Sequence, residues 1–480
     1  MVNSLNLFLM ISGSLYILII LFALFYYFSA MSRKKNVLQI KNLEEDFEEP
    51  FVSIIVPTYN EERNIAVCLQ SLKNLNYSNY EIIVSDGGST DRTIEIAEAL
   101  VDKVIIDKNV PRGWIGKNWG CHLGYKAAAK GDYLLFVDAD TEHTPDSLRY
   151  FVRMSMERDA ALLSVFPYQR LKNWWEAINP LFYFASNLTV GGTNSVNDPS
   201  KPNSHTASGQ YMLFQRKDYE AIGGHEQIKG SIVEDLAFSR VVKIKTGRLF
   251  FINGTKLVYT RMYPDSPKQC YEGWKKCLFP GTKLTQPRRI TGALMWILWG
   301  LLSPVAIVLS ALYSPEWYYL LITSLLHVMS VSAFFIFWNK KGTHLLIAYL
   351  FFPLVNLAFC IMLLISALEL VIKKKTTWRG REYEPDLFVA SLYEKQEVLV
   401  GETNRMPQLD TDVEVELDDK IISESFGGFR LPKAGTAPKV QGTTFHGKPL
   451  PLHQVITYQQ LQQQQQQQQI EQNQSRQLKH

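Results

Sequence analysis

The sequence has few cysteines and no signature of a disulfide framework or a cysteine zinc site: its five cysteines are scattered over 480 residues, without a Cys-x-x-Cys pair. It also has no excess of either charge. Its 50 Lys and Arg against 46 Asp and Glu give a net charge of +4, which disfavours a nucleic-acid binder that works through bulk positive charge. No Gly-x-x-x-x-Gly-Lys-Ser/Thr motif occurs, which excludes a P-loop NTPase. No Gly-x-Gly-x-x-Gly follows a predicted strand, which disfavours a dinucleotide oxidoreductase.

Charge is also missing from a long stretch near the N-terminus. Residues 5–31 are 27 residues without a charge. As a helix they would be about 40 Å long, enough to cross the roughly 30 Å hydrocarbon core of a bilayer. Four basic residues follow directly: Arg33, Lys34, Lys35 and Lys41. By the positive-inside rule we expect an integral membrane protein with an anchor over 1–35 and the following domain on the cytoplasmic side.

Three further apolar stretches lie near the other end of the chain, at 291–313, 317–338 and 344–372. The short connection between the first two predicts a helical hairpin. The third is long for one span and short for two. Single crossings throughout would put the lysines at 373–375 outside, against the positive-inside rule. A third stretch that is re-entrant or interfacial, bent at Pro353, is therefore favoured, and 290–375 is predicted to form transmembrane or interfacial helices.

Between residue 51 and about 260, apolar runs alternate with helical patterns. Five runs are nearly all apolar, as expected for strands covered on both faces: 52–56, 81–85, 104–107, 133–137 and 160–166. This alternation predicts an α/β domain over 50–285, with a mostly parallel sheet flanked by helices. From about 384 to 480 periodicity is lost and a run of eight glutamines occurs, which predicts a disordered tail.

Polar clusters directly follow three of the predicted strands, at 57–61, 86–91 and 138–140. Ligands of parallel α/β sheets bind beyond the carboxyl ends of the strands, so we expect these clusters to face one crevice. Asp138 and Asp140 are costly side by side unless a cation neutralises them. Their oxygen ligands suit Mg²⁺ or Mn²⁺. The alternative is a solvated turn that caps the next helix, since a bare Asp-x-Asp is common.

Other polar residues each allow a functional and a structural interpretation. Asp86 could accept hydrogen bonds from a nucleobase or ribose, in a turn whose hydroxyls also cap a helix. Asp235, preceded by Glu234, could act as a general base, or both acids could simply complement a helix dipole. Lys117, at the end of a Gly-rich loop, could bind a phosphate or be a solvated surface lysine.

Four of these motifs resemble, in order and spacing, the nucleotide-sugar-dependent family 2 glycosyltransferases with a GT-A fold. The likeness covers about residues 50–280 and rests on Pro57–Glu61, Asp86–Asp91, Asp138–Asp140 and Glu234–Asp235. Five more motifs look like the membrane-bound hopanoid- and carotenoid-associated branch of that family: Gly113–Lys117, Ser208–Phe214, Ile222–Glu226, Glu272–Lys275 and Trp378–Tyr383.

The resemblance implies roles for twelve residues. The nucleotide sugar would be bound by Pro57, Tyr59, Glu61, Asp86, Lys117 and Asp138. Asp140, with Asp138, would hold a divalent metal, Mg²⁺ or Mn²⁺, on the diphosphate. Asp235 would be the catalytic base, with Glu234 beside it. The acceptor side would be formed by Gly209, Gln210 and Trp274.

The sequence departs from the family pattern at two points. Gly87 stands where many relatives have a second acid, so only Asp86 carries over. The Gln-x-x-Arg-Trp signature of processive synthases is absent, which favours transfer of one sugar per event. The resemblance thus implies an inverting membrane glycosyltransferase that acts on the hydroxyl or carboxyl group of a lipid-like acceptor, an isoprenoid being one option. A processive polysaccharide synthase and a non-enzymatic membrane scaffold remain alternatives.

Overall fold

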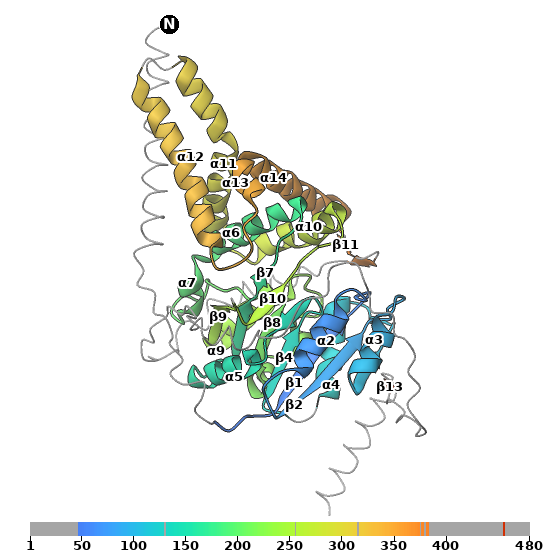
Figure 1. Cartoon of the computed structure of the whole chain (residues 1–480). Helices are drawn as coiled ribbons and strands as arrows, with labels where there is room; N and C mark the ends of the chain where they lie inside the picture. Colours follow the sequence, from blue (N-terminus) through green and yellow to red (C-terminus); the bar gives the residue numbers. More distant parts are fainter. Residues whose placement is uncertain are drawn as a thin grey trace, which may run out of the picture.

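The computed structural model describes residues 47–128, 131–254, 256–313, 316–374, 376–378, 381–383 and 455–456. In these residues a sheet domain lies below a group of apolar helices (Figure 1). The predicted anchor over 1–35 lies outside the described residues, as does the predicted tail over 384–480 apart from Val455–Ile456.

A central sheet has the strand order β13-β3-β2-β1-β4-β8-β6-β9. The bounds are β1 Val52–Thr58, β2 Tyr80–Asp86, β3 Lys103–Ile106, β4 Tyr133–Val137, β6 Leu162–Phe166, β8 Tyr211–Gln215, β9 Leu249–Asn253 and β13 Val455–Ile456. Within this sheet only β8 runs antiparallel to its neighbours, β4 and β6. The other pairs are parallel, so the predicted mostly parallel α/β sheet is confirmed.

Both faces of the sheet are covered because successive side chains of a strand point to opposite sides. In β1, Ile54 lies in one buried core with residues of α2 (Ile65–Lys73), α3 (Thr93–Leu100) and α5 (Ser147–Glu157). Its neighbour Ile55 lies in a second core with residues of α4 (Gly116–Ala127), α8 (Arg216–Ala221) and α9 (Glu234–Thr246). The apolar runs of the sequence therefore form the central sheet of the domain, which is buried on both faces.

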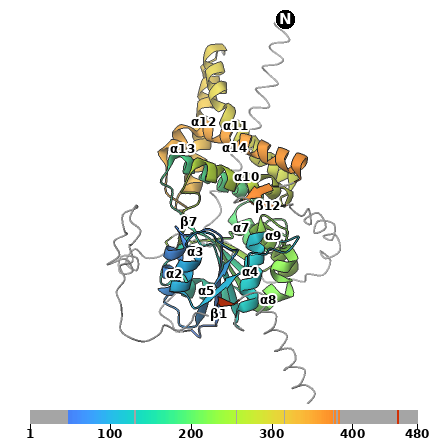
Figure 2. The ribbon, with the colours of Figure 1, turned by 90° about the vertical axis from the view of Figure 1, so that its right-hand side faces the viewer.

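A layer of shorter elements separates the sheet from the apolar helices. A small sheet has the order β5-β10-β7, from Thr141–His143, Val258–Thr260 and Tyr168–Gln169. The helices are α6 (Asn179–Val190), α7 (Thr193–Asn197) and α10 (Pro267–Lys283). In two views at right angles, α6 and α10 lie between the sheet domain and the apolar helices (Figures 1 and 2).

Among the residues that the structure describes, three helical segments are long and apolar enough to cross a membrane: Pro287–Tyr313, Trp317–Trp338 and Phe352–Lys373. The first two are α11 and α12, which lie side by side as the predicted hairpin (Figure 1). The third stretch is broken near Pro353, because α13 (Leu346–Leu350) ends just before α14 (Phe352–Leu368) begins. A π-helical turn over Glu369–Lys373 continues α14, which runs across α10 at a steep angle to the hairpin (Figures 1 and 2).

We predict that Gly124→Ala lowers the melting temperature. A Cβ atom at Gly124 of α4 would lie 2.3 Å from Cγ2 of the fully buried Ile55. Overpacking of this kind costs about 1–3 kcal/mol, which outweighs the roughly 1 kcal/mol that alanine gains over glycine in a helix. Gly120→Ala on the same helix is the control, since its nearest neighbours would lie 3.5 Å away. Thermal unfolding of both variants is the measurement, and equal melting temperatures would contradict this packing.

Candidate active site

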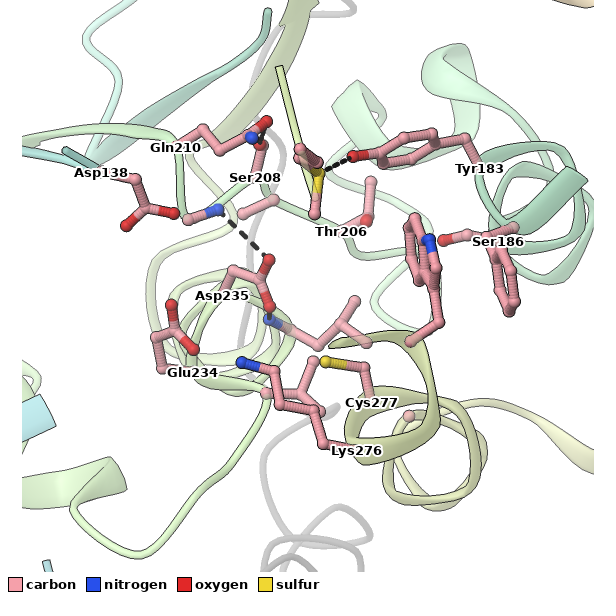
Figure 3. A pocket seen from close by; sticks show the side chains of 18 of the residues that line it. Asp138, Tyr183, Ser186, Thr206, Ser208, Gln210, Glu234, Asp235, Lys276 and Cys277 are labelled. Carbon is pink, nitrogen blue, oxygen red and sulfur yellow. Dashed lines mark hydrogen bonds between the residues drawn. The ribbon is translucent and has the colours of Figure 1, made fainter. Parts of the chain in front are cut away.

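A cavity of about 490 Å³ lies beyond the carboxyl ends of β1 and β4. Eleven of the twelve predicted site residues line it: Pro57, Tyr59, Glu61, Lys117, Asp138, Asp140, Gly209, Gln210, Glu234, Asp235 and Trp274. Figure 3 shows Asp138, Glu234 and Asp235 converging on the space between them. The polar clusters that follow separate strands thus meet in one hollow.

Asp86, the twelfth residue, is not among the lining residues. Its carboxylate is buried and accepts four internal hydrogen bonds. Oδ1 accepts from the backbone N–H groups of Gly88 and Ser89 at 2.8 and 2.6 Å, and Oδ2 accepts from the hydroxyls of Thr58 and Ser89 at 2.9 and 2.6 Å. In this arrangement Asp86 ties the end of β1 to the turn after β2. Its predicted contact with the nucleotide stays a prediction.

Lys117 provides the positive charge between the acids. Its ammonium lies 2.6 Å from Oδ1 of Asp138 and 2.6 Å from Oε1 of Glu234. Burial alone would lower the pKa of Lys117, but the two carboxylates outweigh burial and raise it well above its usual value. Burial likewise opposes the ionisation of Glu234, yet Lys117, with Lys276, holds the pKa of Glu234 below its usual value. The three groups therefore form a charged cluster.

The residue after Lys117 fixes the loop that precedes Glu234 and Asp235. The amide nitrogen of Asn118, a fully buried side chain of α4, lies within hydrogen-bond distance of the carbonyl oxygens of Ile228, Lys229 and Ser231, at 3.1, 3.1 and 2.9 Å. That loop leads directly into α9, whose first two residues are Glu234 and Asp235. Adjacent residues of α4 therefore contact Glu234, through Lys117, and hold the loop that precedes it, through Asn118.

Gly209 lets the backbone approach this cluster closely. Its N–H donates to Oδ2 of Asp235 at 3.2 Å. A Cβ atom at this position would lie 2.6 Å from Oε1 of Glu234 and 3.0 Å from the Lys117 ammonium. A side chain here would therefore displace the ion pair.

Asp235 has the properties of a general base. Burial, followed by the charge of Glu234, raises the pKa of Asp235 to about 7, although two backbone N–H groups favour its ionised form. Its carboxylate faces the cavity (Figure 3). A base with a pKa near neutrality is well matched to accepting a proton at physiological pH.

Comparison with known proteins agrees with this geometry. Residues 53–223 match the family "Glycosyl transferase family 2". Two curated relatives carry the name 4,4'-diaponeurosporenoate glycosyltransferase. The Staphylococcus aureus protein is 29% identical over 280 residues, which cover 57% of this chain and 73% of the relative. The Staphylococcus haemolyticus protein is 29% identical over 272 residues, which cover 56% and 71%.

Residues 53–223 of this chain form a family 2 glycosyltransferase domain. Among solved structures, a mannosyltransferase from Pyrobaculum calidifontis in complex with GDP-Man and Mn²⁺ has a TM-score of 0.43 at 16% identity, covering 76% of this chain and 99% of that one. Glucosyl-3-phosphoglycerate synthase from Mycobacterium tuberculosis has a TM-score of 0.34 at 17% identity, covering 49% and 80%.

The donor atoms of this glycosyltransferase fit a divalent metal that also binds substrate phosphates. Asp138 and Asp140 both line the cavity and offer carboxylate oxygens. In the described part of the chain, no group of three or more His, Cys, Asp or Glu residues could hold a metal by itself. Mg²⁺ commonly uses one or two carboxylates and completes its shell with water and phosphate oxygens. Two aspartates therefore suffice if the donor diphosphate supplies further ligands.

Two residues that we predict to lie on the acceptor side, Trp274 and Gln210, are held by internal contacts. The Trp274 ring stacks on Phe182 at 4.1 Å between centroids, and its Nε1 donates to Oδ1 of Asn179 at 2.7 Å. Gln210 donates to the hydroxyl of Thr260 at 3.0 Å. Both residues line the cavity as rigid parts of its wall.

Sequence reasoning missed several lining residues of the glycosyltransferase. Arg261 lies directly after β10, a strand end that could have signalled it, and its Nε donates to the buried Glu176 at 3.0 Å. Lys276 lies two residues after Trp274 on α10 and extends toward Glu234 (Figure 3). Further polar side chains of the wall come from Tyr183, Ser186, Thr206 and Ser208. For the first three the sequence offers no local signal, whereas Ser208 begins the motif Ser208–Phe214.

We predict that sugar transfer increases with pH through about 7. Below that pH Asp235 is protonated and cannot accept a proton, whereas above it the carboxylate form predominates. Asp235→Asn should lower kcat about 10²- to 10⁴-fold and remove this pH dependence. The measurement is kcat/KM between pH 5 and 9 for both proteins. A wild-type rate that is flat across pH 7 would argue against Asp235 as the base.

We also predict that Gly209→Ala lowers kcat/KM at least about tenfold while the melting temperature stays near that of the wild type. The added Cβ atom meets the ends of flexible charged side chains, so the ion pair shifts while the fold persists; small displacements at an active site are costly for rate. Gly292→Ala on α11, where a Cβ atom meets nothing within 4 Å, is the control. Unchanged activity of Gly209→Ala would show that the spacing of this cluster is unimportant.

Proposed function

We propose that this enzyme transfers one sugar, with inversion, from a nucleotide-diphosphate sugar to the hydroxyl or carboxyl group of a lipid-like acceptor. The observation that carries the proposal is the composition of the cavity wall. One end holds the acids and Lys117, and the other end reaches α11 and α14. A substrate pair with one charged and one apolar partner matches such a cavity.

The apolar end of the cavity is formed by helices long enough to cross a membrane. Ala293 and Ile297 contribute from α11, and Phe359 and Leu363 from α14. On α11, Val305 and Leu312 instead point outward and are more than half exposed, as expected for a surface in contact with lipid. An acceptor dissolved in the bilayer could thus reach the acids without crossing water. This supports an integral membrane enzyme; that its catalytic domain lies on the cytoplasmic side remains our prediction from the basic residues at 33–41.

The transfer is a direct displacement at the anomeric carbon. A bond forms between the acceptor oxygen and that carbon as the bond from the carbon to the diphosphate oxygen breaks. Where the acceptor is a hydroxyl, Asp235 takes its proton; a carboxylate acceptor carries no proton and would only be oriented. Because the acceptor attacks opposite the leaving group, the anomeric configuration inverts.

The charged residues of the cluster bind and orient the donor. Asp138 and Asp140 would hold a divalent metal, Mg²⁺ or Mn²⁺, which would offset the charge that develops on the departing diphosphate. Lys117, between Asp138 and Glu234, supplies a fixed positive charge for the same diphosphate. Pro57, Tyr59, Glu61 and Asp86 remain our predicted nucleotide-sugar residues, and Gly209, Gln210 and Trp274 our predicted acceptor side.

The curated relatives narrow the acceptor class. Their name gives 4,4'-diaponeurosporenoate, a carotenoid-like compound, as what those proteins glycosylate. We propose a carotenoid-like acceptor for this chain too, because the apolar end of the cavity suits a long hydrocarbon. We do not assign that particular compound to it.

The function is tested with membranes that contain the full chain. They are incubated with radiolabelled nucleotide sugars and Mg²⁺ or Mn²⁺, and lipids are extracted into organic solvent. We expect label in the organic phase with at least one donor, and its loss after addition of EDTA. Where the acceptor is a hydroxyl, we expect the same loss in Asp235→Asn. Label that never leaves the aqueous phase with any donor contradicts the proposal, and label in high-molecular-weight polymer would favour a processive synthase.

We predict that Ala293→Phe lowers transfer to lipid at least about tenfold by filling the apolar end of the cavity, while slow release of nucleoside diphosphate to water persists. Val305→Phe is the matched control, because the same enlargement on α11 points away from the cavity. The measurement is organic-phase label against nucleoside diphosphate release. Equal losses of both rates in Ala293→Phe would mean that this end does not hold the acceptor.

A further inference from the structure

A serine of α14 is hydrogen-bonded into the backbone of α10. The Ser366 hydroxyl accepts from the N–H of Phe279 at 3.1 Å and donates to the carbonyl of Lys275 at 2.6 Å. These two backbone groups are four residues apart, the spacing at which an α-helix pairs them with each other. Ser366 is 4% exposed. Its hydroxyl therefore enters the hydrogen-bond ladder of a neighbouring helix, a known cause of helix bending.

The next residue weakens the same turn of α10. Pro280 lies inside the helix and has no N–H, so it cannot donate to the carbonyl of Lys276. Two successive positions of the ladder are thus altered, one by a side chain of α14 and one by proline. The course of α10 at this turn depends on α14 as well as on its own backbone.

A salt bridge joins the same two helices one turn further along. The Lys275 ammonium lies 2.9 Å from Oε2 of Glu369, which follows Ser366 by three residues. Lys275 is buried, so this contact is poorly screened by solvent. Both polar links from α14 therefore hold the outer side of one turn of α10.

The inner side of that turn is part of the active-site wall. Lys276, Cys277 and Gly281 line the cavity. The Lys276 side chain extends toward Glu234 (Figure 3), and its charge helps to lower the pKa of Glu234. A shift of this turn would change the distance between Lys276 and the charged end of the cavity.

We propose that Ser366 is a positioning residue, which holds the Pro280 turn of α10 so that Lys276 lies beside the donor diphosphate. The proposal rests on the proposed function, since the diphosphate belongs to the proposed donor. Lys276 then adds a second positive charge, opposite Lys117. The position of α14, a helix apolar enough to cross a membrane, thereby determines where the positive charge of Lys276 lies in the active site.

The test uses two substitutions of equal shape. Ser366→Thr keeps a hydroxyl, whereas Ser366→Val does not. We expect Ser366→Val to lower kcat about tenfold, since displacement of a charged group costs rate, and Ser366→Thr to restore most of it. Thr323→Val on α12 is the control, because that buried hydroxyl bonds only to carbonyls of its own helix, those of Tyr319 and Leu320. Equal rates for the Val and Thr variants of Ser366 would overturn the proposal.

A double-mutant cycle asks whether Ser366 acts through Lys276. Lys276→Gln alone should lower kcat about tenfold or more, and adding Ser366→Val should lower it little further, because coupled sites are not additive. Additive losses would mean that Ser366 acts by another route and would overturn the proposal.

A third measurement does not need activity. The rate at which a small methanethiosulfonate labels Cys277, followed by peptide mass spectrometry, reports the position of the same turn. We expect Ser366→Val to change it and Ser366→Thr to leave it near the wild type; identical rates would count against the proposal. If the wild type releases no nucleoside diphosphate from any donor, the proposed function fails. In that case the labelling still decides whether Ser366 positions the turn.

Discussion

The structure depends on keeping several carboxylates together in a hollow that is largely shielded from water. Asp138, Asp140, Glu234 and Asp235 line the same cavity, and grouped carboxylates repel one another strongly where the dielectric is low. Lys117 meets this constraint by contacting two of them at 2.6 Å. The remaining negative charge suits a divalent metal, which in the proposed function would in turn bind the diphosphate of the donor.

The rest of the domain serves this cluster through backbone placement. The parallel strands β1 and β4 deliver acids and polar residues at one edge of the sheet, while β8 enters antiparallel beside β4 after the loop that carries Gly209. Since Gly209 has no side chain, its N–H reaches Asp235 without disturbing the pair of Glu234 and Lys117. The backbone around Gly209 thus helps to hold the charged side chains of the cluster in place.

The sequence allowed the sheet and most of the cavity wall to be predicted, because both follow from local patterns. Apolar runs mark strands that are covered on both faces, and polar residues directly after them must lie at one edge. Asp86 fits that pattern, yet its carboxylate already accepts hydrogen bonds from Thr58, Gly88 and Ser89. The sequence could not show the bond from Thr58, because Thr58 and Asp86 meet only through the pairing of β1 with β2. Lys276 was missed for the opposite reason: it lies within helix α10, where no strand end points to it.

The cavity extends beyond the sheet domain to the apolar helices. The sheet edge supplies the acids and the backbone N–H of Gly209, whereas the apolar lining comes largely from helices. Here α6 and α10 fill the space between the two parts, and the stacking of Trp274 on Phe182 fixes them to each other. The cavity can therefore have a charged end on the sheet and an apolar end on α11 and α14. In the proposed function, sugar transfer would take place at the charged end, and the acceptor would enter from the apolar end of the same cavity.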